Sequence, residues 1–78
     1  MYLKSYLPNI QRLRNSLANV GIRIFFLSVG GSDTLFIYKL IIDTKLNKRE
    51  LSDLEFYVHG WADAMEIPFS LNNIDELK

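Results

Sequence analysis

The stretch that decides the fold is IRIFFLSVGGSDTLFIYKLII, residues 22–42, in which two apolar arms flank a glycine-rich centre. Both arms are rich in β-branched and aromatic residues, and Gly31-Ser32 suits a two-residue type II′ turn. The pairs that this turn would set are Val29 with Thr34, Leu27 with Phe36, and Phe25 with Tyr38. The stretch therefore predicts an antiparallel β-hairpin.

Both faces of this predicted hairpin are apolar. One face would carry Phe25, Leu27, Val29, Phe36, Tyr38, Leu40 and Ile42. The other would carry Ile22, Ile24, Phe26, Leu35, Ile37 and Ile41, interrupted by Ser28 and Lys39. An antiparallel sheet with one side open to water is usually apolar on one face only. We therefore expect dimerisation or another protein to cover the second face.

An amphipathic helix is predicted before the hairpin. Apolar residues recur at steps of three and four, in the stripe Leu3, Leu7, Ile10, Leu13, Leu17 and Val20. Pro8 suits a first helical turn, and Gly21 suits a left-handed stop. The regular helix should begin near Pro8, with a turn or an extra helical stretch before it.

A second helix is predicted after the hairpin. Asn47 and Glu50 have the spacing of a capping box, and Leu46 and Leu51 have that of a hydrophobic staple. Pro68 disfavours helical geometry in the residue before it, which ends the helix. The expected buried stripe is Leu51, Leu54, Val58, Trp61 and Met65. Residues 67–71 suit a short strand, and residues 72–78 a weak helical turn or a frayed tail.

These elements predict one α+β domain over residues 1–78, with two layers in the order helix, β-hairpin, helix (α-β-β-α). A short third strand near the C-terminus is a further option. A domain of 78 residues buries a small core, and without cysteine it can form no disulfide. Oligomerisation is another common way to stabilise a domain of this size. The apolar runs IFFL and LFIY are far shorter than the ~20 residues of a membrane span, so no membrane role is expected. A cytoplasmic location is the default expectation.

Charge is distributed unevenly along the chain. The only charged side chains before Asp33 are the cations Lys4, Arg12, Arg14 and Arg23. Such asymmetry can mark a nucleic-acid surface. Four cations spread over a helix and a strand start make a small footprint, so a solvated basic helix face is the simpler interpretation.

His59, the only histidine, lies on a polar stripe of the second predicted helix, made of Ser52, Glu55, His59, Asp63 and Glu66. An imidazole flanked by carboxylates can act as a general base or bind a metal across a dimer axis. One helix stripe supplies neither a pocket nor a second histidine. We therefore expect a solvated polar face, with no catalytic residue, metal ligand or cofactor.

Gly60 needs a reason, because glycine inside a helix costs about 1 kcal/mol relative to alanine. With Ala64 it forms a small-residue flank beside Phe56 and Tyr57. Close packing against the protein's own hairpin is the simpler explanation. Contact with a second subunit or a partner is the alternative.

Lys45, Lys48 and Arg49 crowd the start of the same helix, where the macrodipole favours anions. Free helix amides beside these cations could hold a phosphate or an acidic partner loop. A screened surface cluster is the simpler interpretation.

The sequence thus predicts a non-enzymatic protein-binding factor, such as an inhibitor, an immunity- or antitoxin-like factor or an adaptor, acting as a homodimer through an apolar hairpin surface. The expected partner-binding residues are Phe25, Phe36, Tyr38, Phe56, Tyr57, Gly60, Lys45, Lys48 and Arg49. The alternative is a nucleic-acid-binding regulator that uses Lys4, Arg12, Arg14 and Arg23.

Overall fold

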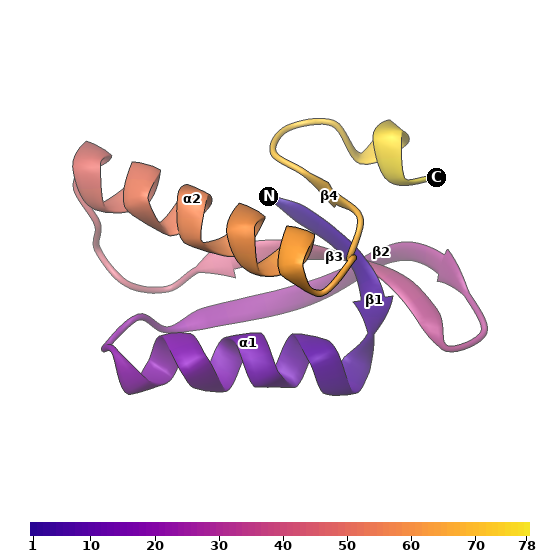
Figure 1. Ribbon diagram of the computed structural model, residues 1–78, viewed down its shortest axis with the longest axis horizontal. Coiled ribbons are helices and arrows are strands. Elements are labelled where there is room, and N and C mark those ends of the chain that lie inside the picture. The colour runs from indigo at the N-terminus through magenta and orange to yellow at the C-terminus, as the bar shows by residue number, and fades with distance from the viewer.

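The computed structural model describes residues 1–78 and contains two helices and a four-stranded antiparallel sheet (Figure 1). The elements are β1 (Tyr2–Tyr6), α1 (Leu7–Asn19), β2 (Ile24–Ser32), β3 (Leu35–Ile42), α2 (Lys48–Ala64), β4 (Phe69–Ser70) and the 3-10 helix η1 (Ile74–Leu77). The α+β class is confirmed. The predicted α-β-β-α order is incomplete, because β1 precedes α1 and β4 follows α2.

The strand order in the sheet is β2-β3-β1-β4. The unit β1–α1–β2 therefore leaves a gap that β3 fills, and β3–α2–β4 leaves a gap that β1 fills. This interleaving of two βαβ units is the split βαβ, or ferredoxin-like, arrangement. Folds of this kind host many unrelated functions, so the function has to be argued from the surface.

β1 is a central strand where the sequence predicted a turn or an added helical stretch. Leu3 and Ser5 are buried, while Tyr2, Lys4 and Tyr6 alternate with them towards the other face of the sheet. This period of two is the strand pattern. Five residues are too few to separate it from a helical stripe, because Leu3 also has the spacing that continues the α1 stripe.

The hairpin forms as predicted, but the predicted register is wrong. The strands close at Ser32 and Leu35, so the turn is Asp33-Thr34, with Asp33 in the left-handed region at φ 54°. This later turn alone would keep the predicted faces, but an irregularity between Ser28 and Gly30 moves the pairing back by one residue and places Phe25 opposite Ile41. The faces of β2 are consequently exchanged relative to those of β3.

Gly31, which was predicted to lie in the turn, lies instead in the paired part of the hairpin. Its φ is 103°, and a Cβ there would lie 2.5 Å from the carbonyl oxygen of Leu35. The glycine therefore lets the two strands approach closely inside the hairpin. The hairpin tip extends beyond both helices (Figure 1).

The core lies between the helices and one face of the sheet. Its buried members are Leu3, Ile10, Leu13, Leu17, Ile24, Tyr38, Leu40, Leu54, Val58, Ala62 and Ile67. The buried stripe of α2 is Leu54, Val58 and Ala62. Relative to the predicted stripe it is rotated towards Ala62, so Leu51 and Met65 are exposed and Trp61 is half-buried.

The predicted cap of α2 and the glycine stop after α1 are confirmed, whereas α2 ends at Ala64, with Glu66 at φ 57°, before the predicted stop at Pro68. The Glu50 N–H donates to Asn47 Oδ1 at 2.8 Å, and the Asn47 N–H donates to Glu50 Oε1 at 3.1 Å, which completes the capping box. Gly21 follows α1 with φ 83°. Leu7 and Val20, at the two ends of the predicted α1 stripe, are exposed.

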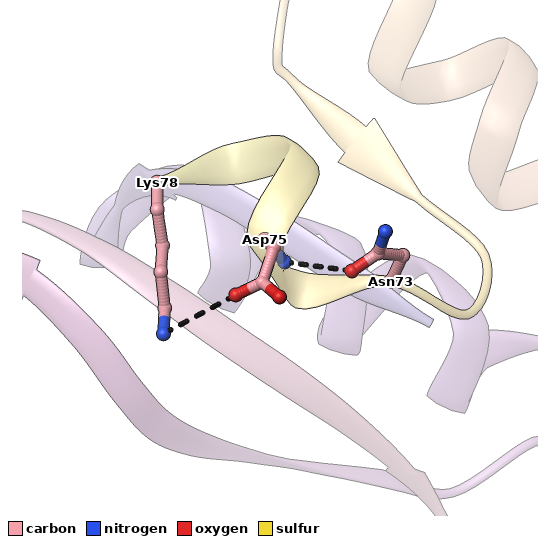
Figure 2. A network of polar contacts seen from close by, with 3 residues as sticks. All are labelled: Asn73, Asp75 and Lys78. Atoms are coloured by element: carbon pink, nitrogen blue, oxygen red, sulfur yellow. Dashed lines mark hydrogen bonds and ion pairs between the residues drawn. The ribbon is translucent and has the colours of Figure 1, made fainter.

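The C-terminal segment forms the predicted short strand β4 and then the turn η1. The Asp75 N–H donates to Asn73 Oδ1 at 3.0 Å, and Lys78 Nζ lies 3.5 Å from Asp75 Oδ1 (Figure 2). The Asn73 N–H donates to Ser70 Oγ, a side chain on the face opposite the helices. η1 packs against β1 and β4, so the segment covers that side of the sheet.

A second, smaller set of buried residues accompanies this cover. Ile37 and Leu77 are 2% and 5% exposed, and neither belongs to the main core. Ile37 pairs with Lys4 and lies on the face opposite the helices. The sheet is therefore covered by α1 and α2 on one face and by η1 on part of the other.

Candidate interaction surface

The β2–β3 part of the sheet face opposite the helices carries exposed apolar side chains. Phe25 and Leu27 are each 53% exposed, and Ile41 is 41% exposed. Phe25 and Ile41 are direct cross-strand partners, and Leu27 lies on the same face two residues along β2. We call these three residues the apolar strip. A contiguous group of exposed apolar side chains marks an interaction site more often than scattered ones do.

Lys39 is the only charged side chain beside the apolar strip on these two strands. It pairs with Leu27 on one side and with Tyr2 on the other. Its exposed ammonium makes no ion pair, because the ion pairs of the protein are His59–Asp63 and Lys78–Asp75. Within the two strands the strip therefore has a single cation at its border and no acid, and the exposed pair Arg23 and Asp43 follows Phe25 and Ile41 just beyond the strand ends.

The register separates the aromatic residues predicted to bind a partner. Phe25 lies on the apolar strip, whereas Phe36 and Tyr38 lie on the helix-covered face. Tyr38 is only 7% exposed, and its ring packs edge-to-face on those of Phe26 and Phe36 at centroid distances of 6.1 Å. Tyr38 thus belongs to the core and Phe36 borders it. The exposed residues beside Phe25 on the face opposite the helices are instead Leu27 and Ile41, which the sequence analysis did not select.

Phe56, Tyr57 and Gly60 lie on the outside of α2. Phe56 is 77% exposed, and no atom lies within 4 Å of a Cβ placed on Gly60. The expectation that Gly60 packs closely against the hairpin is therefore wrong. Phe56 and Tyr57 point to different sides of the helix, since they line two separate clefts.

The Phe56 cleft has a volume of about 370 Å³ and lies between α2, β4 and η1. His59 lies in its wall with a half-exposed side chain, 3.7 Å from Asp63 Oδ2. The imidazole also stacks on Phe69, with a centroid distance of 4.7 Å and an interplanar angle of 13°. This stack joins α2 to β4 and gives His59 a packing role that the helix spacing did not predict.

Glu55 lies one turn before His59 and is half-buried. Burial lowers the pKa of the Met1 amino group, and the charge of Glu55 opposes that shift. The carboxylate thus acts on the start of β1 as well as lining the cleft with His59. The predicted polar stripe is otherwise exposed.

The Tyr57 cleft has a volume of about 540 Å³ and lies between the end of α1 and the start of α2. Lys45, Glu50 and Asp53 are among its lining residues. Lys48 and Arg49 are exposed at the first positions of α2, beside the capping box. The predicted cationic cluster is therefore at the surface, next to two carboxylates.

The four cations of the nucleic-acid alternative are not on one surface. Arg12 and Arg14 are exposed on α1. Lys4 is half-buried on the sheet face opposite the helices, and Arg23 is exposed in the loop before β2. The sheet separates Lys4 from the two α1 arginines.

Comparisons of the chain with protein-family models, with curated proteins and with solved structures find no match. Neither helix of the protein is long and apolar enough to span a bilayer.

Proposed function

We propose that the chain is a small non-enzymatic protein-binding factor of the inhibitor, immunity, antitoxin or adaptor type, that its partner contacts the apolar strip, and that it acts as a homodimer. The observation that carries this proposal is the exposure of Phe25, Leu27 and Ile41 side by side on one sheet face. Removing such side chains from water is the dominant favourable term in most protein–protein association. Aromatic residues are also enriched at the centres of interfaces.

The apolar strip is a better candidate than the outside of α2. Phe56 is more exposed than any residue of the strip, and it shares its cleft with the apolar residues Phe69 and Leu71. Its cleft is lined by Ser52, Glu55 and Glu76 as well as by apolar residues. Depletion of charge is typical of an interface core, and the strip meets that condition.

The test is affinity capture from the cells in which the protein occurs, with three forms of the chain as bait. They are the unchanged chain, a form with Phe25→Ser and Leu27→Ser, and a matched control with Val20→Ser and Phe56→Ser. The control removes two apolar side chains that are more exposed, at 71% and 77%, but lie outside the sheet. We expect one protein to be enriched by the first and third baits and lost from the second.

A nuclease treatment of each sample separates the two classes of partner. Loss of the captured protein after nuclease would indicate the nucleic-acid alternative, since the contact would then be indirect. Loss with the helix control and retention with the sheet variant would place the site on α2 and contradict the proposal.

A further inference from the structure

The two edges of the sheet are protected to very different degrees. β4 is only two residues long, and short edge strands resist pairing with another chain. β2 has nine residues and lies at the other edge, with β3 as its only neighbour. It contains no proline and no charged residue. Its one protective feature is the irregularity at Val29, which leaves residues 24–28 as a regular unprotected edge.

The backbone groups that face this free edge follow from the ladder. The Asp43 N–H donates to the Arg23 carbonyl at 2.8 Å, so these two residues form a hydrogen-bonded pair. Hydrogen-bonded and non-hydrogen-bonded pairs alternate in an antiparallel ladder. Phe25 and Leu27 therefore bond to β3, whereas the N–H and C=O groups of Ile24, Phe26 and Ser28 point away from the sheet.

Those three residues form a self-complementary edge. When a second β2 lies antiparallel with its centre on Phe26, Ile24 meets Ser28 of the second copy and Phe26 meets its own equivalent. All three become hydrogen-bonded pairs. Phe25 then stands opposite Leu27 of the second copy in a non-hydrogen-bonded pair, where side chains come closest. The same contact occurs twice, as a two-fold axis requires.

We infer that two copies of the chain pair through β2 in this register and form a continuous eight-stranded sheet. This inference rests on the proposed function. It identifies the molecule that binds the β2 edge, beside the apolar strip, as a second copy of the chain. Phe25 of each copy becomes the cross-strand neighbour of Leu27 in the other copy. The two apolar strips then form one continuous surface across the two-fold axis. Each monomer contributes half of the surface that a partner protein would contact.

The register can be tested with two double variants that differ only in the sign of the charge at residue 25. In Phe25→Glu with Leu27→Glu, each interface pair brings two carboxylates together. In Phe25→Lys with Leu27→Glu, each pair is of opposite charge. Both variants carry Leu27→Glu, and residue 27 lies opposite Lys39 of the same chain, so the environment within the monomer is matched at that position. Sedimentation equilibrium over the micromolar range gives the dimer dissociation constant, and circular dichroism checks the fold.

We expect the unchanged chain to dimerise, the Glu/Glu variant to be monomeric, and the Lys/Glu variant to dimerise at least about tenfold more tightly than the Glu/Glu variant. A monomeric unchanged chain would overturn the inference. Two monomeric variants would show a dimer in another register, and two dimeric variants would show a dimer through another surface. Each of these results overturns it as well.

Failure of this inference is distinguishable from failure of the proposed function. Both charged variants lose the apolar strip, so both should lose the captured partner whatever their oligomeric state. Capture by a monomeric unchanged chain that both charged variants lose would support the apolar strip as the partner site and reject dimerisation, including the β2 pairing. A Lys/Glu dimer that still captures the partner would support the dimer and reject the strip as the partner site.

Discussion

At the scale of single residues, Gly60 has no packing reason within the domain. It lies inside α2, and nothing within 4 Å would meet an added Cβ. Glycine in a helix interior costs about 0.5–1 kcal/mol relative to alanine. We therefore expect Gly60→Ala to raise the free energy of unfolding by about that amount. Thermal melting followed by circular dichroism should show a midpoint higher by about 2–8 °C.

Gly31→Ala is the matched control for this prediction. Its Cβ would meet backbone atoms at 2.5 and 2.6 Å with φ at 103°, so the same chemical change should destabilise the protein. A lower melting midpoint for Gly60→Ala would contradict the open environment of Gly60. Loss of dimerisation in Gly60→Ala would instead make the α2 flank the interface.

His59 shows what helix spacing predicts and what it misses. The spacing correctly places Asp63 one turn away, at 3.7 Å, because residues four apart in a helix are neighbours. The stack on Phe69 depends on how the chain returns after Pro68 and crosses the end of α2. No local pattern contains that information.

At the scale of elements, the start of α2 and the end of α1 were predictable, whereas the end of α2 and the strand pairing were not. Asn47 and Glu50 are three residues apart, so their capping box can be recognised from a short stretch of sequence. The register of β2 and β3 depended on choosing between Gly31-Ser32 and Asp33-Thr34 as the turn. Glycine was the stronger turn signal, yet Gly31 is used for close approach of the strands. Aspartate tolerates the left-handed region that the actual turn requires.

The start of α2 carries a testable electrostatic conflict. Lys48 and Arg49 are cations at the end of the helix that favours anions, and Glu50 is the one acid in the first turn. Replacing both by glutamate should stabilise the domain by about 0.3–1 kcal/mol per site at low salt. Urea unfolding at low and high salt would measure the gain, which should shrink as salt screens it.

Arg12→Glu provides the control for that change, because Arg12 is exposed in the middle of α1, away from either helix end. It should leave stability nearly unchanged. Partner capture by the Lys48→Glu, Arg49→Glu form separates the roles of the cluster. Retained capture would leave the apolar strip as the binding surface, and lost capture in a stabilised protein would make the helix start part of it.

At the scale of the whole molecule, the candidate site could be predicted in kind but not in detail. Two apolar hairpin faces and only two helices correctly indicated a face that the helices do not cover. Which residues occupy that face depended on the register, so Phe25 was identified while Leu27 and Ile41 were not. The central strand β1 and the cover formed by η1 come from the two ends of the chain, and their pairing with the hairpin is long-range.

The same architecture predicts that the C-terminal turn is a structural part of the domain. Leu77 is buried although it lies outside the main core, and η1, which carries it, packs against β1 and β4. Truncating a buried leucine to alanine commonly lowers the free energy of unfolding by about 2–5 kcal/mol. We expect about 2 kcal/mol for Leu77, because a turn at the surface can relax around the smaller side chain. A domain of this size has roughly 4–12 kcal/mol of total stability, so Leu77→Ala should lower the melting midpoint by about 8 °C or more.

Leu71→Ala is the control for Leu77→Ala, since it makes the same change in the same segment at a side chain that is 40% exposed. It should cost much less than Leu77→Ala. Loss of the packing of η1 against β1 and β4 should also expose apolar surface, which a rise in the fluorescence of a hydrophobic dye would report. Equal melting midpoints for the two variants would show that η1 does not hold the sheet.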